Sequence, residues 1–206
     1  MEKGFFIVFE GIEGSGKTTQ SILLSEKLKN RDYDVIHTKE PGGTDFGEKI
    51  RNILLHEDEV SDITELLLFL ADRKEHIERL IKPSLEKNRI VISDRYFYST
   101  LAYQIGGRKL DEDMVNYLNN IIVDNLIPDI VFYIDIDAEE SIKRKKHSHL
   151  DRIEREEMFF HINIRNEYLR IAEKSENFIV VDGKKPIQDV HHIICDYLRE
   201  NYGFDI

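Results

Sequence analysis

The chain has 206 residues, of which 41% are hydrophobic, so it can build one sizeable core and we expect a single domain over residues 1–206. Its 29 Lys and Arg residues are outnumbered by 40 Asp and Glu residues, and the formal charge of -11 disfavours a general attraction to nucleic acid or to an anionic membrane. Cys195 is the only cysteine, which excludes an internal disulfide. We find neither a secretory signal nor an apolar stretch of membrane-spanning length, so we expect the protein to work in the cytoplasm.

Short apolar runs alternate along the chain with longer stretches of helical periodicity. The runs are rich in β-branched and aromatic residues, so we expect strands covered on both faces at residues 5–9, 35–38, 90–92, 130–134 and 178–181. Helices are predicted over residues 62–82, before Pro83, and over residues 112–126, 153–174 and 187–201. The alternation predicts an α/β fold, in which a five-stranded parallel sheet has helices on both faces.

The helix predicted over residues 62–82 has two distinct faces. Six apolar residues form one stripe that we expect to face the core: Ile63, Leu66, Leu67, Leu70, Ile77 and Ile81. Phe69, Arg73 and His76 follow one another at spacings of four and three, which places them together on a flanking face.

A phosphate-binding loop follows the first predicted strand and opens a helical pattern. It matches G-x-x-x-x-G-K-S/T, and with Thr19 it forms the expected ATP-binding set of Gly11, Ile12, Glu13, Gly14, Ser15, Gly16, Lys17, Thr18 and Thr19. The glycines let backbone N–H groups converge on phosphate oxygens, and Lys17 offsets the charge of the terminal phosphates. We expect Thr18 to bind Mg²⁺, with Asp94 after the strand at residues 90–92 holding the ion or one of its waters.

A phosphate loop alone predicts nucleotide binding, and further motifs are needed to narrow the activity. A GTPase would need a guanine-reading Asn-Lys-x-Asp, and no Asn in this chain is followed by Lys. The remaining motifs are EPGGT at residues 40–44, TELLLFLADR at 64–73, DRY at 94–96, STLAYQ at 99–104 and LDRIE at 150–154. In that order they closely resemble the thymidylate kinase family over nearly the whole chain.

The resemblance implies a nucleoside monophosphate kinase fold that transfers the γ-phosphoryl group of ATP to dTMP, gives dTDP and ADP, uses Mg²⁺ and is usually a homodimer. Two alternatives remain at this point. One is another nucleoside monophosphate kinase, and the other is a module that binds ATP without transferring its phosphoryl group.

The resemblance also implies a dTMP site. Phe69 would stack on thymine, Arg73 would donate to a thymine carbonyl, and Tyr103 would lie under the deoxyribose where a 2′-hydroxyl would collide. The complete expected set is Glu10, Pro41, Arg51, Phe69, Arg73, Arg95, Ser99, Thr100, Tyr103 and Gln104, with Thr100 and Gln104 near the base edge.

Phosphate handling is assigned to cations by the same resemblance. Arg51 and Arg95 would clamp the monophosphate, a task suited to the planar guanidinium group, and Glu10 would lie near the 3′-hydroxyl and the waters of Mg²⁺. The phosphate loop has no Arg or Lys before Lys17, so a lid over residues 143–152 must supply a further cation, for which we expect Arg152. The expected catalytic set is therefore Lys17, Arg95, Arg152 and Glu10.

Three details depart from the family pattern or stay open. Lys39 stands where bacterial members commonly have an arginine, and His147 stands in the basic stretch where an arginine is common. Whether a cis bond precedes Pro41 is left undecided by the sequence.

Overall fold

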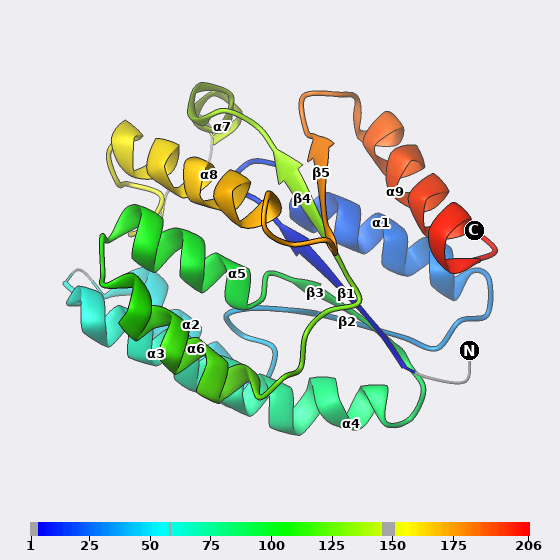
Figure 1. Ribbon diagram of the computed structural model, residues 1–206, viewed down its shortest axis with the longest axis horizontal. Helices are drawn as coiled ribbons and strands as arrows, with labels where there is room; N and C mark the ends of the chain where they lie inside the picture. Colours follow the sequence, from blue (N-terminus) through cyan, green and yellow to red (C-terminus); the bar gives the residue numbers. More distant parts are fainter. Residues whose placement is uncertain (1–3, 58, 146–150) are drawn as a thin grey trace.

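Residues 4–57, 59–145 and 151–206 are described by a computed structural model (Figure 1). Its five strands are β1 (Phe5–Glu10), β2 (Val35–Lys39), β3 (Ile90–Asp94), β4 (Ile130–Asp135) and β5 (Phe178–Asp182). They form one parallel sheet in the order β2-β3-β1-β4-β5. All of the predicted strands are confirmed, and so is the α/β fold with its five-stranded parallel sheet.

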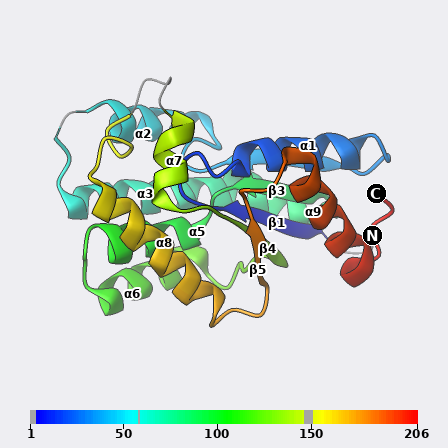
Figure 2. The same ribbon diagram turned by 90° about the horizontal axis from the view of Figure 1, so that it is seen from above.

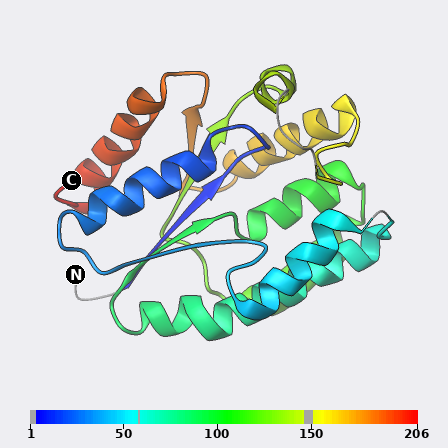
Figure 3. The ribbon, with the colours of Figure 1, turned by 180° about the vertical axis from the view of Figure 1, so that it is seen from behind.

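Helices cover both faces of this sheet, as Figures 1 and 3 show from opposite sides. The helices are α1 (Lys17–Lys29), α2 (Asp45–His56), α3 (Asp62–His76), α4 (Lys82–Leu85), α5 (Phe97–Thr100), α6 (Glu112–Val123), α7 (Ala138–Lys145), α8 (Met158–Ala172) and α9 (Ile187–Tyr202), with π-helical segments η1 (Ile77–Ile81) and η2 (Leu101–Gly107). In the part of the chain that the structure describes, no helix combines the length and the apolar character needed to cross a bilayer.

The two faces arise from the alternation of side chains along each strand. On β1, Ile7 and Phe9 pack against Leu24 of α1 and against α9, and Phe6 and Val8 point to the opposite face. That second face packs against η1, α5, η2 and α8. Because both sets are fully buried, the strands read as continuous apolar runs in the sequence.

Three predicted helices differ from the structure at their ends. The helix of residues 62–82 continues through η1 into α4, where Pro83 lies in the first turn, because a proline without an amide hydrogen is tolerated there. The helix of residues 112–126 ends at Val123, since Asp124 and Asn125 both have positive φ. The helix of residues 153–174 begins only at Met158.

The predicted apolar stripe, which runs along α3 and η1, is only partly buried. Leu66, Leu70, Ile77 and Ile81 enter the core as expected, whereas Ile63 and Leu67 are 44% and 52% exposed. The stripe therefore divides between the core and an open face at the end of the molecule where α2, α3 and α6 gather, opposite the two termini (Figure 2).

Candidate functional site

The phosphate loop connects the carboxyl end of β1 to the start of α1, next to the point where β3 ends. Gly14 and Gly16 have φ values of 74° and 95°, a left-handed backbone that glycine adopts without strain. Lys17 is buried at the first position of α1, and its Nζ lies 3.3 Å from Glu13 Oε2. The loop thus has the geometry that the sequence predicted for a phosphate cradle.

Thr18 and Asp94 meet where the loop faces β3. Thr18 Oγ1 donates a hydrogen bond to Asp94 Oδ2, and Asp94 Oδ1 is buried without a partner among the described residues. β1 and β3 pair in parallel with Phe9 opposite Asp94, which brings the carboxylate to the loop. A hydroxyl beside a carboxylate with a spare buried oxygen is a donor set that fits Mg²⁺.

A cavity of about 330 Å³ opens beside the phosphate loop. Most of the residues expected to bind dTMP line it together with two phosphate-loop residues and the predicted metal ligands. They are Glu13, Lys17, Thr18, Pro41, Arg51, Phe69, Asp94, Arg95, Ser99, Thr100, Tyr103 and Gln104. Lys39, Glu40, Leu55, Asp151 and Ile153 complete its wall. We call this space the acceptor cavity.

Arg95 lies at the end of the acceptor cavity nearest the phosphate loop. Its φ of 77° is unusual for a residue with a side chain and points to a position held by its surroundings. Its guanidinium donates to Ser99 Oγ at 2.9 Å and to Tyr103 Oη at 3.0 Å, and it pairs with Glu13. Glu13 therefore contacts both Lys17 and Arg95, so the two cations share one carboxylate.

Arg51 approaches the cavity from α2. Its Nη1 donates to the carbonyl oxygen of Pro41 at 2.9 Å. The bond from Glu40 to Pro41 is cis, which decides the question that the sequence left open. Arg51 and Arg95 both line the acceptor cavity, as a pair that clamps one phosphate requires.

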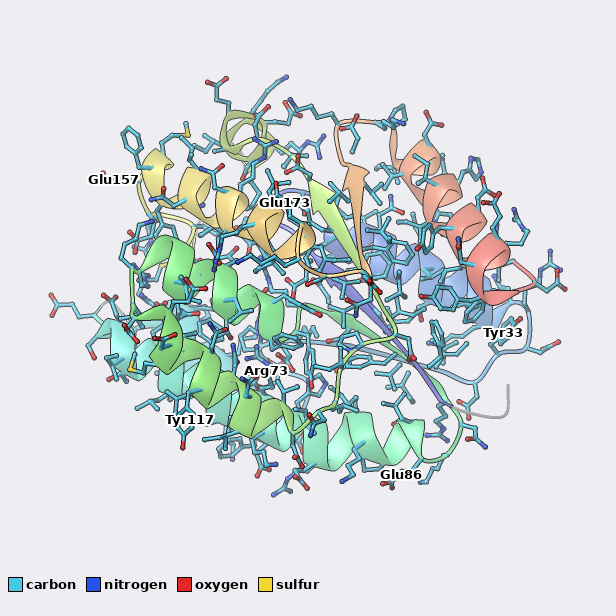
Figure 4. All side chains as sticks on the ribbon, in the orientation of Figure 1. Tyr33, Arg73, Glu86, Tyr117, Glu157 and Glu173 are labelled. Carbon is cyan, nitrogen blue, oxygen red and sulfur yellow. The ribbon has the colours of Figure 1, made fainter. Side chains whose placement is uncertain are left out.

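The other end of the acceptor cavity is lined by Phe69, Thr100 and Gln104. Arg73, in contrast, lies behind this wall and is 1% exposed; Figure 4 labels it inside the body of the molecule. Its Nε donates to Glu40 at 2.8 Å and its Nη1 donates to Thr100 Oγ1 at 2.8 Å. Arg73 was expected to contact the base. In the structure it does not line the cavity, and its hydrogen bonds instead hold two residues of the cavity wall, Glu40 and Thr100.

Glu10 is also placed behind the wall. Its two oxygens accept from the amide nitrogens of Tyr96 and Ser99, from Ser99 Oγ and from Tyr168 Oη. Burial raises the pKa of Glu10, although the positive charge of Arg95 opposes this. The carboxyl group therefore braces the segment that carries Arg95 and Ser99, and it does not line the acceptor cavity.

A second cavity, of about 510 Å³, lies on the other side of the phosphate loop. Gly14, Ser15, Gly16 and Thr19 of the loop line it, together with Arg144 and the segment from Gly183 to Ile187. Arg144 donates to the carbonyl oxygens of Gly14 and Gly183, at 3.2 Å and 2.9 Å. We call this space the donor cavity, because the loop that lines it is the one expected to bind ATP, the phosphoryl donor.

Arg152 does not point to the phosphate loop. Its Nη2 donates to Glu65 and its Nε donates to the carbonyl oxygen of Leu54 at 3.1 Å, so its guanidinium lies against α2 and α3. Glu65 is buried, and a buried carboxylate needs charged or polar hydrogen-bond donors; Arg152 is one of the donors to Glu65. The lid residues 146–150, His147 among them, lie outside the described residues.

Several residues of the site were missed by sequence reasoning. Glu65, Asp72 and Tyr168 support the cavity through contacts with residues far away in the chain. The signal available for Glu65 and Asp72 was a carboxylate at each end of the apolar stretch 66–71, and such flanking charges are more often solvated.

Comparisons with known proteins agree with this geometry. The family model for thymidylate kinase matches residues 9–194. A thymidylate kinase of Sulfurihydrogenibium sp. (strain YO3AOP1) is 49% identical over 200 residues, which are 96% of this chain and 98% of that protein. One of Fervidobacterium nodosum is 46% identical over 189 residues, covering 92% of this chain and 95% of its own. The crystal structure of thymidylate kinase from Ehrlichia chaffeensis has a TM-score of 0.80 at 37% identity and covers 96% of this chain and 99% of that one.

Proposed function

The chain belongs to the thymidylate kinase family and phosphorylates dTMP to dTDP with ATP as the donor, and on that premise we propose how its residues divide the reaction. The observation that carries the proposal is the position of Glu13, which contacts Lys17 of the phosphate loop and Arg95 of the acceptor cavity. The cations for the two phosphate groups are therefore already neighbours, as transfer between those groups requires.

ATP would bind with its phosphates on the loop. The backbone amides of the loop and the start of α1 would hold the phosphate oxygens, and Lys17 would offset their charge. The donor cavity would take the nucleoside, with Arg144 of α7 between the loop and Gly183. Mg²⁺ would be held by Thr18 and Asp94, where it would neutralise charge on the β and γ phosphates.

dTMP would occupy the acceptor cavity with its phosphate toward the loop. Arg51 and Arg95 would hold that phosphate, and Phe69 and Tyr103 would contact the base and the sugar. Pro41 and Ser99 line the same cavity at its phosphate end, beside Arg51 and Arg95, to which they are hydrogen-bonded.

No protein base needs to take a proton in this reaction, because a monophosphate is already ionised and nucleophilic at neutral pH. This fits the position of Glu10, whose oxygens accept hydrogen bonds from Tyr96, Ser99 and Tyr168. We propose that Glu10 acts by positioning Ser99, which in turn contacts Arg95. Catalysis would then consist of alignment and charge neutralisation.

Within the described part of α7, we propose that Arg144 is the cation nearest the phosphates of ATP. We propose that Arg152 has an anchoring role. Arg144 already contacts the carbonyl oxygen of Gly14 in the loop. Arg152 is bound to Glu65 and holds the segment that follows the lid against α3.

A homodimer is the assembly that we propose. Exposed apolar side chains gather on three helices that pack side by side: Phe46 and Ile53 of α2, Ile63 and Leu67 of α3, and Tyr117 and Ile121 of α6. Figure 4 shows Tyr117 pointing away from the body of the molecule. An open apolar face of this kind favours association with a second copy.

Cys195 is buried and unpaired, which fits our proposal that the protein works in the cytoplasm.

A coupled assay of ADP release tests the activity. With ATP and Mg²⁺ we expect rapid release with dTMP and at least about tenfold lower kcat/KM with dAMP, dGMP and dCMP. Equal activity with a purine monophosphate would favour another nucleoside monophosphate kinase. ADP release that is independent of any acceptor would contradict the proposed transfer.

A further inference from the structure

Glu65 of α3 is a buried carboxylate on which three side chains converge. Its Oε1 accepts hydrogen bonds from Gln104 Nε2 at 2.8 Å and from Arg108 Nε at 3.1 Å. Its Oε2 accepts from Arg108 Nη2 at 3.0 Å and from Arg152 Nη2. The side chain is 1% exposed, so these contacts replace water around the carboxylate.

This arrangement dictates which end of the Gln104 amide faces Glu65. A carboxylate that already accepts from two guanidinium groups offers only acceptor atoms, so the amide must present its N–H₂ group to it. The opposite orientation would bring two oxygens together in a buried site. The amide oxygen of Gln104 is thereby turned away from Glu65.

The amide oxygen of Gln104 is left without a hydrogen bond by the residues that the structure describes. Gln104 is fully buried, it lines the acceptor cavity, and its Oε1 has no hydrogen-bond partner in the described part of the chain. A buried carbonyl oxygen without a donor is unfavourable, and a ligand in the cavity would correct this by supplying an N–H group.

We propose that Glu65 is a positioning residue that fixes the Gln104 amide with its oxygen available to the base, and that this makes the site require an N–H donor at N3 of a pyrimidine. The inference rests on the proposed function, because it assumes that a pyrimidine monophosphate occupies the acceptor cavity. Thymine and uracil carry N3–H, whereas cytosine has a lone pair at N3. A buried acceptor facing that lone pair stays unpaired, so cytosine is rejected.

Glu65 itself is held by two arginines, Arg108 and Arg152. Arg108 pairs with Glu156 as well as with Glu65, and its guanidinium lies 4.7 Å from the centre of the Phe160 ring. Arg152 adds the contact from the segment after the lid. The carboxylate cannot turn without breaking these pairs, so the orientation of Gln104 follows from α3, η2 and α8 together.

The test compares three variants for their selectivity between dTMP, dUMP and dCMP. Glu65→Gln gives Gln104 a partner that both donates and accepts, so the amide is no longer held in one orientation. Glu65→Asp keeps the charge but withdraws the carboxylate from Gln104. Glu156→Gln is the matched control, because it removes the negative charge of another partner of Arg108 without touching Gln104. KM, kcat and dissociation constants from calorimetry are measured for each nucleotide, with circular dichroism to verify folding.

We expect Glu65→Gln to raise the KM for dTMP and for dUMP about tenfold, with kcat within about threefold and the ratio of dTMP to dCMP affinity reduced at least tenfold. Glu156→Gln should leave that ratio unchanged. Adding Gln104→Leu to Glu65→Gln should have no further effect on the ratio, because both changes remove the same recognition.

An unchanged ratio in folded Glu65→Gln or Glu65→Asp overturns the proposal, and so do effects of Glu65→Gln and Gln104→Leu that add in full. If neither Glu65 variant folds, Gln104→Leu alone must reduce the ratio at least tenfold, and a retained ratio overturns the proposal. Failure of the proposed function looks different, because the parent protein would then not phosphorylate dTMP at all.

Discussion

The carboxyl group of Asp72 makes the stability of the protein depend on pH. Asp72 is fully buried on α3, and its Oδ1 accepts from the amide nitrogen of Gly42 at 3.1 Å, in the loop that follows the cis bond. Its Oδ2 has no partner among the described residues. Burial, and then the negative charge of Glu40, raise the pKa of Asp72 from the usual 3.8 to about 6.

A carboxyl group whose pKa is raised in the folded state binds its proton more tightly there than in the unfolded chain. Its contribution to stability is full below the unfolded value of 3.8 and is lost as the pH rises through about 6. The difference between the two pKa values corresponds to roughly 3 kcal/mol in total. Between about pH 5 and about pH 8 the loss is roughly 1.4 kcal/mol, or about 3–6 °C in Tm for a chain of this size.

Asp72→Asn keeps the oxygen that accepts from Gly42 and removes the titration. The free energy of unfolding of the variant, relative to the parent, should therefore improve by roughly 1.4 kcal/mol between about pH 5 and about pH 8. Urea unfolding followed by circular dichroism at both pH values measures it, with Asp113→Asn on the exposed side of α6 as the control for loss of a carboxylate. The same pH dependence in parent and Asp72→Asn would refute the reasoning.

Three further predictions concern the site and the assembly. Arg144→Met should raise the KM for ATP at least about tenfold and leave dTMP binding, measured by calorimetry, unchanged. Arg152→Met should instead lower the free energy of unfolding by about 2 kcal/mol. A loss of kcat of about 10² or more in Arg152→Met alone would return the catalytic role to Arg152. Tyr103→Phe should keep the preference for dTMP over its ribose counterpart and Tyr103→Ala should lose it, and an unchanged ratio in the alanine variant would exclude this ring as the steric barrier. Leu67→Asp should convert a dimer to a monomer in sedimentation equilibrium, and a dimer that persists would place the interface elsewhere.

Local patterns predicted the fold and the phosphate loop well. The strands and the loop depend on neighbouring residues, so apolar runs and the spacing from Gly11 to Thr18 were sufficient. The continuation of the helix through Pro83 into α4 was harder to predict, because the π-helical turn of η1 before it is set by packing.

Long-range contacts account for what the sequence could not predict. Arg152 matches a lid motif, yet its partner Glu65 lies 87 positions away in the chain, and no spacing rule connects them. Arg73 and Glu10 were expected to contact dTMP, whereas the packed structure places both behind the wall of the cavity. The choice between lining a site and supporting it depends on tertiary packing.

Transfer of label from ATP carrying ³²P in its γ-phosphate tests the central claim most directly. The account predicts that label appears in dTDP at the same rate as ADP forms, and that removing Mg²⁺ or replacing Lys17 with Met slows both together by about 10² or more. Label that appears only as inorganic phosphate, or that never enters dTDP, would contradict it.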